Sequence, residues 1–151
     1  MSICVNTESG EHTFPCFFKN FSFPDTAKHQ NITVYRACST HKIEYSSFLP
    51  SFIESHYKAP AGLTLDDPRA YSVSTYLRVK DLKRFCALNS KFQPPWVLAK
   101  GEITVDSGLC CQTSDYIKGK NKRPNSHVDW WVYEGIPYWE TFHEVNYDDE
   151  L

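Results

Sequence analysis

Hydrophobic and polar residues alternate along several stretches of the chain, and alternation with a period of two predicts β-strands. Residues 31–37 (NITVYRA) are also rich in β-branched and aromatic side chains, which strands favour. Arg36 shares a face of this strand with Ile32 and Val34, so it either ends an inward-facing row or emerges at the end of the strand. The same reasoning predicts further strands at residues 71–77, 96–105, 127–133 and 137–145.

Two stretches instead show apolar residues at helical spacing. Residues 47–57 (SFLPSFIESHY) predict a short helix with Ser47 as the N-cap and Pro50 in the first turn. Residues 80–89 (KDLKRFCALN) predict a second helix. Helices and strands are interleaved, so the sequence predicts one α+β domain over residues 1–151. Its sheet is expected to be mixed or antiparallel, with at least four strands and about two helices.

Two segments lack a regular pattern. Residues 12–25 (HTFPCFFKNFSFPD) predict an irregular or edge-strand stretch that lays aromatic rings onto the core. Residues 106–126 predict a long loop, and loops of this length in compact domains are usually functional or disordered. The cations of this loop favour contact with a phosphate, a nucleic-acid backbone or an acidic partner, or else simply keep it solvated. They are Lys118, Lys120, Lys122 and Arg123.

Composition narrows the class of protein. The formal net charge of −2 excludes a globally basic nucleic-acid binder, so nucleic acid is unlikely as a partner except through the 118–123 segment. The first residues lack the basic and apolar regions of a secretory signal, and no apolar run approaches a membrane span. A cytoplasmic location without membrane contact is therefore expected. The six cysteines form no C-x-x-C motif, which predicts reduced thiols and no metal site.

The strand predicted at 127–133 (HVDWWVY) carries the most conspicuous side chains. Its alternation places Trp130 in the core and puts His127, Asp129 and Trp131 together on the other face. An acid two residues from a histidine can orient the imidazole as a general base, or the two can be ordinary neighbours under a second layer. Trp131 can likewise stack on a planar ligand or be a core residue.

Three further positions define an order of chemical groups along the chain. Arg36 ends an early strand, Ser72 and Ser74 lie on a middle strand, and Glu102 lies on a later one. This order resembles the Arg, Ser-Thr-Ser, Glu order of the arginine-type ADP-ribosyltransferases. Those enzymes are small mixed domains built round a split sheet, and they consume NAD.

The resemblance implies a role for each of these residues. Arg36 would grip the diphosphate of NAD, Ser72 or Ser74 would orient the nicotinamide ribose, and Glu102 would stabilise the ribosyl cation. Trp131 or Tyr76 would face the nicotinamide ring. The sequence departs from the family because its serine motif is Ser-Val-Ser-Thr and it lacks a Glu-x-Glu pair. The carboxylate role is therefore also open to two later acids, Glu134 and Glu140.

Two functions of different class follow. One is ADP-ribosyl transfer or NAD glycohydrolysis, with NAD as substrate, no metal, and His127 as a further catalytic residue. The other is a non-catalytic inhibitor or adaptor, including one encoded on a mobile element, that binds a protein partner through aromatic residues and the basic loop.

Overall fold

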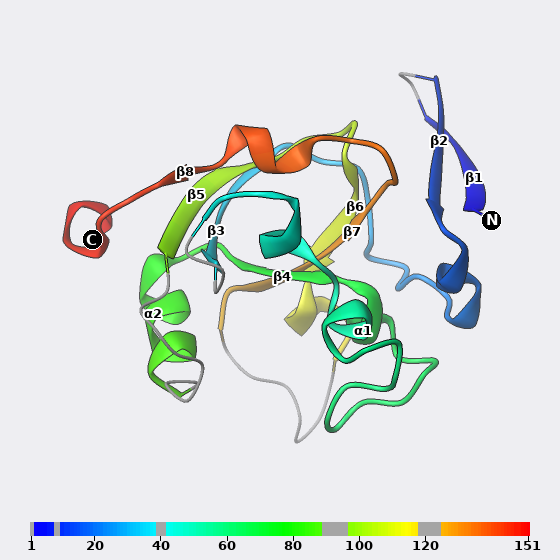
Figure 1. The fold of residues 1–151 in the computed structure, drawn as a ribbon, viewed down its shortest axis with the longest axis horizontal. Coiled ribbons are helices and arrows are strands. Elements are labelled where there is room, and N and C mark those ends of the chain that lie inside the picture. Colours follow the sequence, from blue (N-terminus) through cyan, green and yellow to red (C-terminus); the bar gives the residue numbers. More distant parts are fainter. Residues whose placement is uncertain (1, 8–9, 39–41, 89–96, 118–124) are drawn as a thin grey trace.

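A six-stranded antiparallel sheet forms the centre of the protein in its computed structural model (Figure 1). The structure describes residues 2–7, 10–38, 42–88, 97–117 and 125–151, with side chains from residue 12 onward. The strand order is β6-β7-β4-β3-β5-β8. The bounds are β3 Ile32–Cys38, β4 Val73–Tyr76, β5 Val97–Ile103, β6 Gly108–Gln112, β7 His127–Val132 and β8 His143–Glu144.

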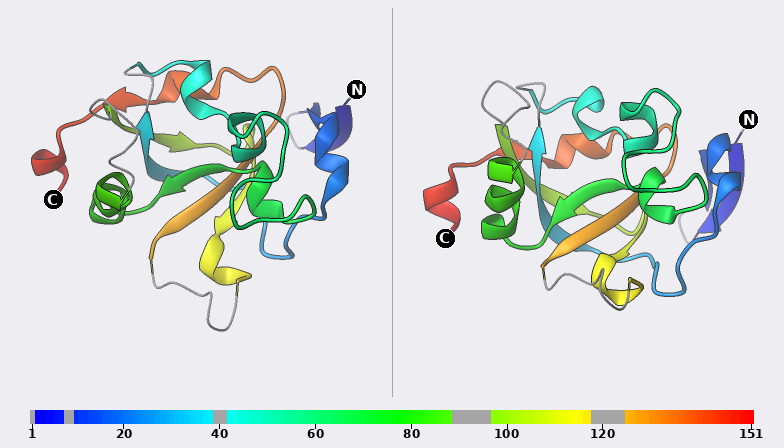
Figure 2. Two further views of the ribbon diagram at one scale, coloured as in Figure 1. Left: turned by 60° about the horizontal axis from the view of Figure 1, so that its bottom comes forward. Right: turned by 90° about the horizontal axis from the view of Figure 1, so that it is seen from below.

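A separate hairpin and several short helices complete the fold. Among the described residues, strands β1 (Ser2–Thr7) and β2 (Gly10–Pro15) pair only with each other, and the two α-helices are α1 (Ser51–Glu54) and α2 (Val79–Leu88). Figure 2 shows the hairpin at one end of the molecule and the C-terminus at the other. The 3-10 helices in the described part of the chain are η1 Cys16–Asn20, η2 Tyr45–Phe48, η3 Pro68–Tyr71, η4 Thr113–Asp115, η6 Tyr138–Thr141 and η7 Tyr147–Glu150.

The α+β class and the antiparallel alternative for the sheet are confirmed, and four of the five predicted strands and the 80–89 helix are present with shifted ends. The helix predicted at 47–57 is wrong in extent, because Pro50 separates η2 from α1 and Ser47 lies inside η2 rather than at an N-cap. The strand predicted at 137–145 is wrong in extent, because Tyr138–Thr141 form η6 and only His143 and Glu144 form strand β8.

The loop predicted at 106–126 is also wrong in part. Its residues 108–112 form strand β6, which pairs with β7 from Gly108 opposite Val132 to Gln112 opposite Val128. Gly108 has a φ of +149°, and a Cβ at this position would lie 1.9 Å from the carbonyl oxygen of Trp131. This close approach of two backbones explains a glycine at the start of the strand. The four loop cations lie outside the described residues.

One face of the sheet is mostly apolar, with Thr75 and Arg36 as buried polar residues on it. Val34, Val73, Val128 and Trp130 project from three strands into a core that is closed by Phe48 and the segment from Tyr138 to Phe142. Trp130 has no exposed surface, and its indole N–H donates to Ser107 Oγ at 3.1 Å. The predicted core side of 127–133 is therefore confirmed.

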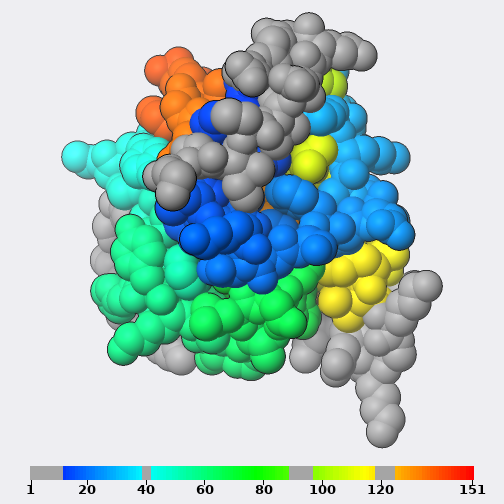
Figure 3. Space-filling model, turned by 90° about the vertical axis from the view of Figure 1, so that its right-hand side faces the viewer, coloured from blue at the N-terminus to red at the C-terminus, as the bar shows by residue number. Residues whose placement is uncertain are grey.

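The opposite face carries two apolar clusters. α2 packs Val79 and Leu82 against Tyr35 and Tyr76 near one end of the sheet. Near the other end, Trp131 and neighbouring side chains pack against aromatic residues in and after β2, namely Phe14, Phe17, Phe18, Phe21 and Phe23. Figure 3 shows this N-terminal segment (blue) wrapped over that end of the molecule, against the green segment that follows α1. Polar side chains of β4 and β7 lie between the two clusters.

The described residues contain no helix with the length and apolarity needed to cross a membrane. Five of the cysteines lie in the described part of the chain with side chains, and all five are free thiols. Of these, Cys38, Cys110 and Cys111 are buried. Burial raises the pKa of each of these three thiols, to about 12 for Cys110 and about 11 for Cys111.

Candidate functional site

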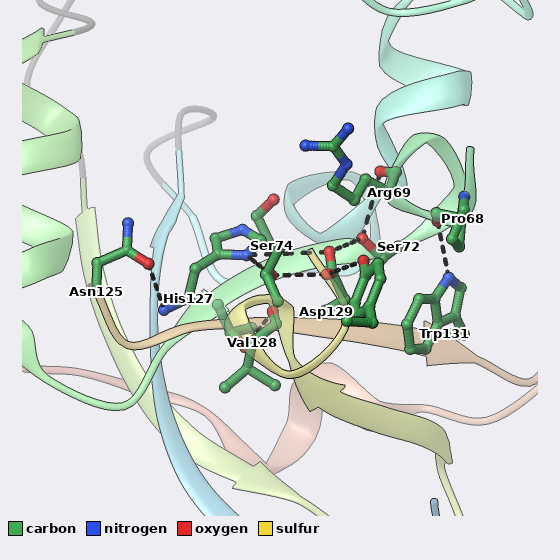
Figure 4. A network of polar contacts seen from close by, with 12 residues as sticks. Pro68, Arg69, Ser72, Ser74, Asn125, His127, Val128, Asp129 and Trp131 are labelled. Atoms are coloured by element: carbon green, nitrogen blue, oxygen red, sulfur yellow. Dashed lines mark hydrogen bonds and ion pairs between the residues drawn. The ribbon is translucent and has the colours of Figure 1, made fainter. Parts of the chain in front are cut away.

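The polar site is built on the pairing of β4 with β7. Ser74 lies opposite Asp129 and Tyr76 lies opposite His127 in the antiparallel register. Directly opposed residues point to the same face, so these four side chains gather on the face that carries α2. Figure 4 shows Ser74, His127 and Asp129 between the α2 side and the segment that follows α1, with Ser72 at the far end of the row.

Asp129 is the centre of this site. Its carboxylate has no exposed surface, and three hydroxyl groups donate to it. Ser72 Oγ lies 2.5 Å from Oδ1, while Thr113 Oγ1 and Tyr116 OH lie 2.7 and 2.5 Å from Oδ2. A buried carboxylate is costly unless such donors replace its lost water, so the three hydroxyls hold this acid in place. Burial and then the charge of Asp129 raise the pKa of Tyr116, which keeps its phenol protonated as a donor.

Hydrogen-bond accounting fixes the tautomer of His127. Thr113 Oγ1 lies within hydrogen-bond distance of both Asp129 Oδ2 and His127 Nδ1. The ionised carboxylate only accepts and the hydroxyl has one proton, so Thr113 donates to Asp129 and accepts from Nδ1–H. His127 Nε2 is then the unprotonated nitrogen, and it has no hydrogen-bond partner among the residues that the structure describes.

The electrostatic surroundings keep this imidazole neutral. Burial lowers the pKa of His127, the charge of Asp129 opposes that shift, and the charges of Arg36 and Arg69 reinforce it. Direct contact with the carboxylate is weak, since Nδ1 lies 3.9 Å from Oδ1. The side chain is 18% exposed, so a neutral histidine with an available Nε2 lies at the open side of a buried acid. This arrangement suits a general base.

Arg36 lies at a split in the sheet. β3 and β4 pair at a single position, Tyr35 opposite Tyr76, and then diverge. The Arg36 guanidinium fills the opening, where NH1 donates to the Ser74 carbonyl at 2.7 Å and Nε donates to the Ser47 carbonyl at 2.7 Å. Arg36 thus supplies to Ser74 the bond that a longer β3–β4 ladder would have given it.

A second arginine lies close to the site. Arg69 Nε and NH2 bond the two carboxylate oxygens of Asp67 at 3.1 and 2.7 Å. Burial alone would raise the pKa of Asp67, but these bonds lower it below its ordinary value. The Arg69 side chain remains 31% exposed. Its charge and that of Arg36 both act on His127, so the site combines a base with two fixed cations.

The structure brings together some predicted site residues and separates others. Ser72, Ser74 and His127 belong to one site, and Arg36 reaches it from the Val34 face only through the Ser74 backbone carbonyl. Glu102 is exposed on β5 opposite Thr33, two strands away from β4. Glu134 and Glu140, the other acids considered for the carboxylate role, are exposed beyond the end of β7.

The two aromatic residues expected at the nicotinamide ring are both buried. The Tyr76 ring contacts the His127 ring edge-on at 5.1 Å, and burial raises the pKa of Tyr76 to about 12. Trp131 is fully covered, and its indole N–H donates to the Pro68 carbonyl at 2.9 Å. The face that carries Trp131 is therefore packed rather than wet, because Phe21 and Phe23 lie against the indole.

Sequence reasoning missed Thr113 and Tyr116, and it considered Asp129 only as an acid that orients His127 or as its ordinary neighbour. Thr113 and Tyr116 follow β6 in the stretch predicted to be an unstructured loop. The alternation of 127–133 was a usable signal for Asp129, because it placed the acid beside His127. Comparison with family models, curated proteins and solved structures found no match for this chain.

Proposed function

We propose that the polar site cleaves the bond between nicotinamide and ribose in NAD, as a hydrolase or as an ADP-ribosyltransferase. The observation that carries this proposal is the row of Ser72, Ser74, Asp129 and His127 beside a split in the sheet, where Arg36 donates to the Ser74 backbone carbonyl. The order Arg, Ser-x-Ser, acid of the resembling family is kept when Asp129 replaces Glu102 as the acid.

Each group then has a chemical task. Arg36 and Arg69 supply positive charge for the diphosphate, and guanidinium groups suit phosphate oxygens. The Ser74 side chain is partly exposed, and its hydroxyl has no hydrogen bond with the described residues. It can therefore contact the ribose. Asp129 holds Ser72 and, through Thr113, His127, and its negative charge favours the developing ribosyl cation.

The reaction balances with these groups alone. The C1′–N1 bond breaks, and nicotinamide leaves as a neutral molecule with both bonding electrons. Water or a hydroxyl, amine or guanidine of an acceptor then attacks C1′, and its proton passes to His127 Nε2. The lowered pKa of His127 keeps Nε2 available to accept that proton at neutral pH.

The test is nicotinamide release from NAD by the purified protein, measured by chromatography. Asp129→Asn and Glu102→Gln are the matched pair of variants, since one acid lies in the site and the other is exposed on β5. We expect turnover by the wild type and by Glu102→Gln, and its loss in Asp129→Asn with the fold retained. Wild-type protein without turnover, and without a rise in Tm on addition of NAD, would overturn the proposal.

A cytoplasmic location belongs to this proposal, since NAD is an intracellular substrate and free thiols persist in reducing compartments. The alternative of a non-catalytic inhibitor or adaptor relied in part on the basic segment 118–123, which lies outside the described residues. The aromatic surface that this alternative requires is present at a different place, in the cavity described next.

A further inference from the structure

A cavity of about 560 Å³ opens next to the start of β4. Tyr71 and Val73 form part of its wall, and Ser72 between them bonds Asp129, so the cavity and the site share one segment of chain. This volume lies within the range of ligand-binding pockets, roughly 300–1,000 Å³. Nothing in the proposed NAD chemistry uses it.

The wall of the cavity is aromatic and carries negative charge. Eight of its seventeen described lining residues are Phe, Tyr or Trp, and Glu134 is the single charged residue among them. Two further acids, Glu44 and Glu140, are exposed and precede or follow the lining residues Tyr45 and Trp139 in the chain. The chemistry of the wall therefore complements a ligand that combines apolar groups with a positive charge.

The ring geometry at one corner of the cavity favours a cation. The Tyr45 and Trp139 rings meet at 69° with centroids 5.6 Å apart, and the Trp139 and Tyr138 rings meet at 82° with centroids 5.3 Å apart. Rings at near right angles present a face and edges to the same space, and a ring face attracts an ammonium or guanidinium group. Tyr45 is 54% exposed, so a ligand can reach this corner from solvent.

Tyr57 is presented to the cavity at a conformational cost. α1 ends with hydrogen bonds from Tyr57 N to Phe52 O and from His56 N to Ile53 O, the pattern of a Schellman motif. His56 and Tyr57 have φ values of +57° and +63°, where glycine is the favoured residue. Tyr57 nevertheless carries a large ring that is 64% exposed at the cavity. A strained backbone that carries an exposed aromatic side chain indicates that Tyr57 contacts a ligand.

We propose that this cavity binds a segment of a partner protein in which a lysine or arginine is flanked by apolar residues. The cationic group lies at the Tyr45–Trp139 corner, Glu134 offsets its charge, and the flanking apolar residues fill the remaining aromatic wall. The cavity is larger than one basic side chain requires, which favours a peptide segment over a free cation. This binding does not depend on NAD turnover.

Blocked heptapeptides of sequence GLPXPLG test the proposal by isothermal titration calorimetry, with X as arginine, lysine, norleucine or glutamate. We expect the arginine and lysine peptides to bind roughly tenfold more tightly than the norleucine peptide, and the glutamate peptide not to bind. Equal binding of the norleucine peptide, or no binding of any peptide, would overturn the proposal. Binding of N-acetylarginine amide as tightly as the arginine peptide would also overturn it, because the ligand would then be a small cation.

Variants locate the binding surface. We expect weaker binding of the arginine peptide in Tyr57→Ala and in Glu134→Gln. We expect unchanged binding in Tyr57→Phe, which keeps the ring, and in Leu88→Ala, which lies on the exposed side of α2. Unchanged binding in both Tyr57→Ala and Glu134→Gln would place the peptide elsewhere and contradict the proposal. Nicotinamide release from free NAD is measured for the same variants, so failure of the cavity proposal is distinguished from failure of the NAD proposal.

Discussion

Ser72 Oγ donates a 2.5 Å hydrogen bond to Asp129 Oδ1, across 57 residues of sequence and from the residue just before β4 to the middle of β7. Both residues are buried, with 1% and 0% exposure. Thr113 and Tyr116 complete the set of donors from the segment after β6. One carboxylate therefore connects the start of β4, the middle of β7 and the turn after β6, and its contacts decide both stability and the position of His127.

Removal of the Ser72 hydroxyl is expected to destabilise the protein. Ser72→Ala leaves Asp129 buried with one donor fewer, which should lower the free energy of unfolding by about 1–3 kcal/mol. Urea denaturation followed by circular dichroism measures this change. Ser74→Ala is the control, since the Ser74 side chain is partly exposed, and a change below about 0.5 kcal/mol is expected there. Equal effects of the two variants would contradict the assigned contact.

Arg36 should not be replaceable by lysine. Its guanidinium reaches the carbonyls of Ser47 and Ser74 at once, whereas an ammonium group cannot reproduce this fork. We expect Arg36→Lys to cost about 1.5–3 kcal/mol of unfolding free energy. Arg78→Lys changes an exposed arginine that pairs with Asp81 at the surface and should cost less than about 1 kcal/mol. Similar losses for both arginines in denaturant titrations would contradict the structural role of Arg36 at the split.

The lowered pKa of His127 predicts how stability depends on pH. The folded state binds a proton at His127 less readily than the unfolded chain, whose histidine titrates near 6.5. This residue's stabilising contribution is therefore fully present above pH 6.5 and is lost as the pH falls through 6.5 towards the folded pKa. Unfolding free energies of wild type and His127→Gln at pH 7.5 and 5.5 should differ in slope, with the shallower slope in the variant. Parallel slopes would mean that His127 does not titrate with folding.

The left-handed residues after α1 predict a stabilising substitution. His56→Gly relieves a φ of +57° and should raise the free energy of unfolding by about 1 kcal/mol. Gly62→Ala provides the reverse change, because Gly62 has a φ of +81° with no heavy atom within 4 Å of an added Cβ; it should lose about 1 kcal/mol. Both are measured as shifts of Tm by differential scanning calorimetry. A lower Tm for His56→Gly would show that the imidazole makes a compensating contact.

Local patterns along the chain were enough to predict the main strands and the longer helix. Alternation in 31–37, 71–77 and 127–133 reflects the two-residue repeat of a strand, which any tertiary arrangement must respect. The same alternation placed Trp130 in the core and set Asp129 beside His127. Residues with less regular patterns were misjudged. Pro50 divided the expected helix, and the segment at 138–141 is a 3-10 helix despite its β-favouring aromatic residues.

Only the tertiary structure decided which polar residues meet. β6 carries no strong alternation of its own, since Cys110 and Cys111 are both buried, and it is a strand because β7 offers it a partner. That pairing brings Thr113 and Tyr116 to Asp129, and the split between β3 and β4 brings Arg36 to Ser74. Glu102 matched the Arg, Ser-x-Ser, Glu order along the chain, yet its strand β5 lies two strands away from β4. The sequence by itself determined which segments are strands and which is the longer helix, because the repeat of apolar positions reflects the local geometry of the backbone. The composition of the site depended on register and strand order, which are set by packing between distant segments.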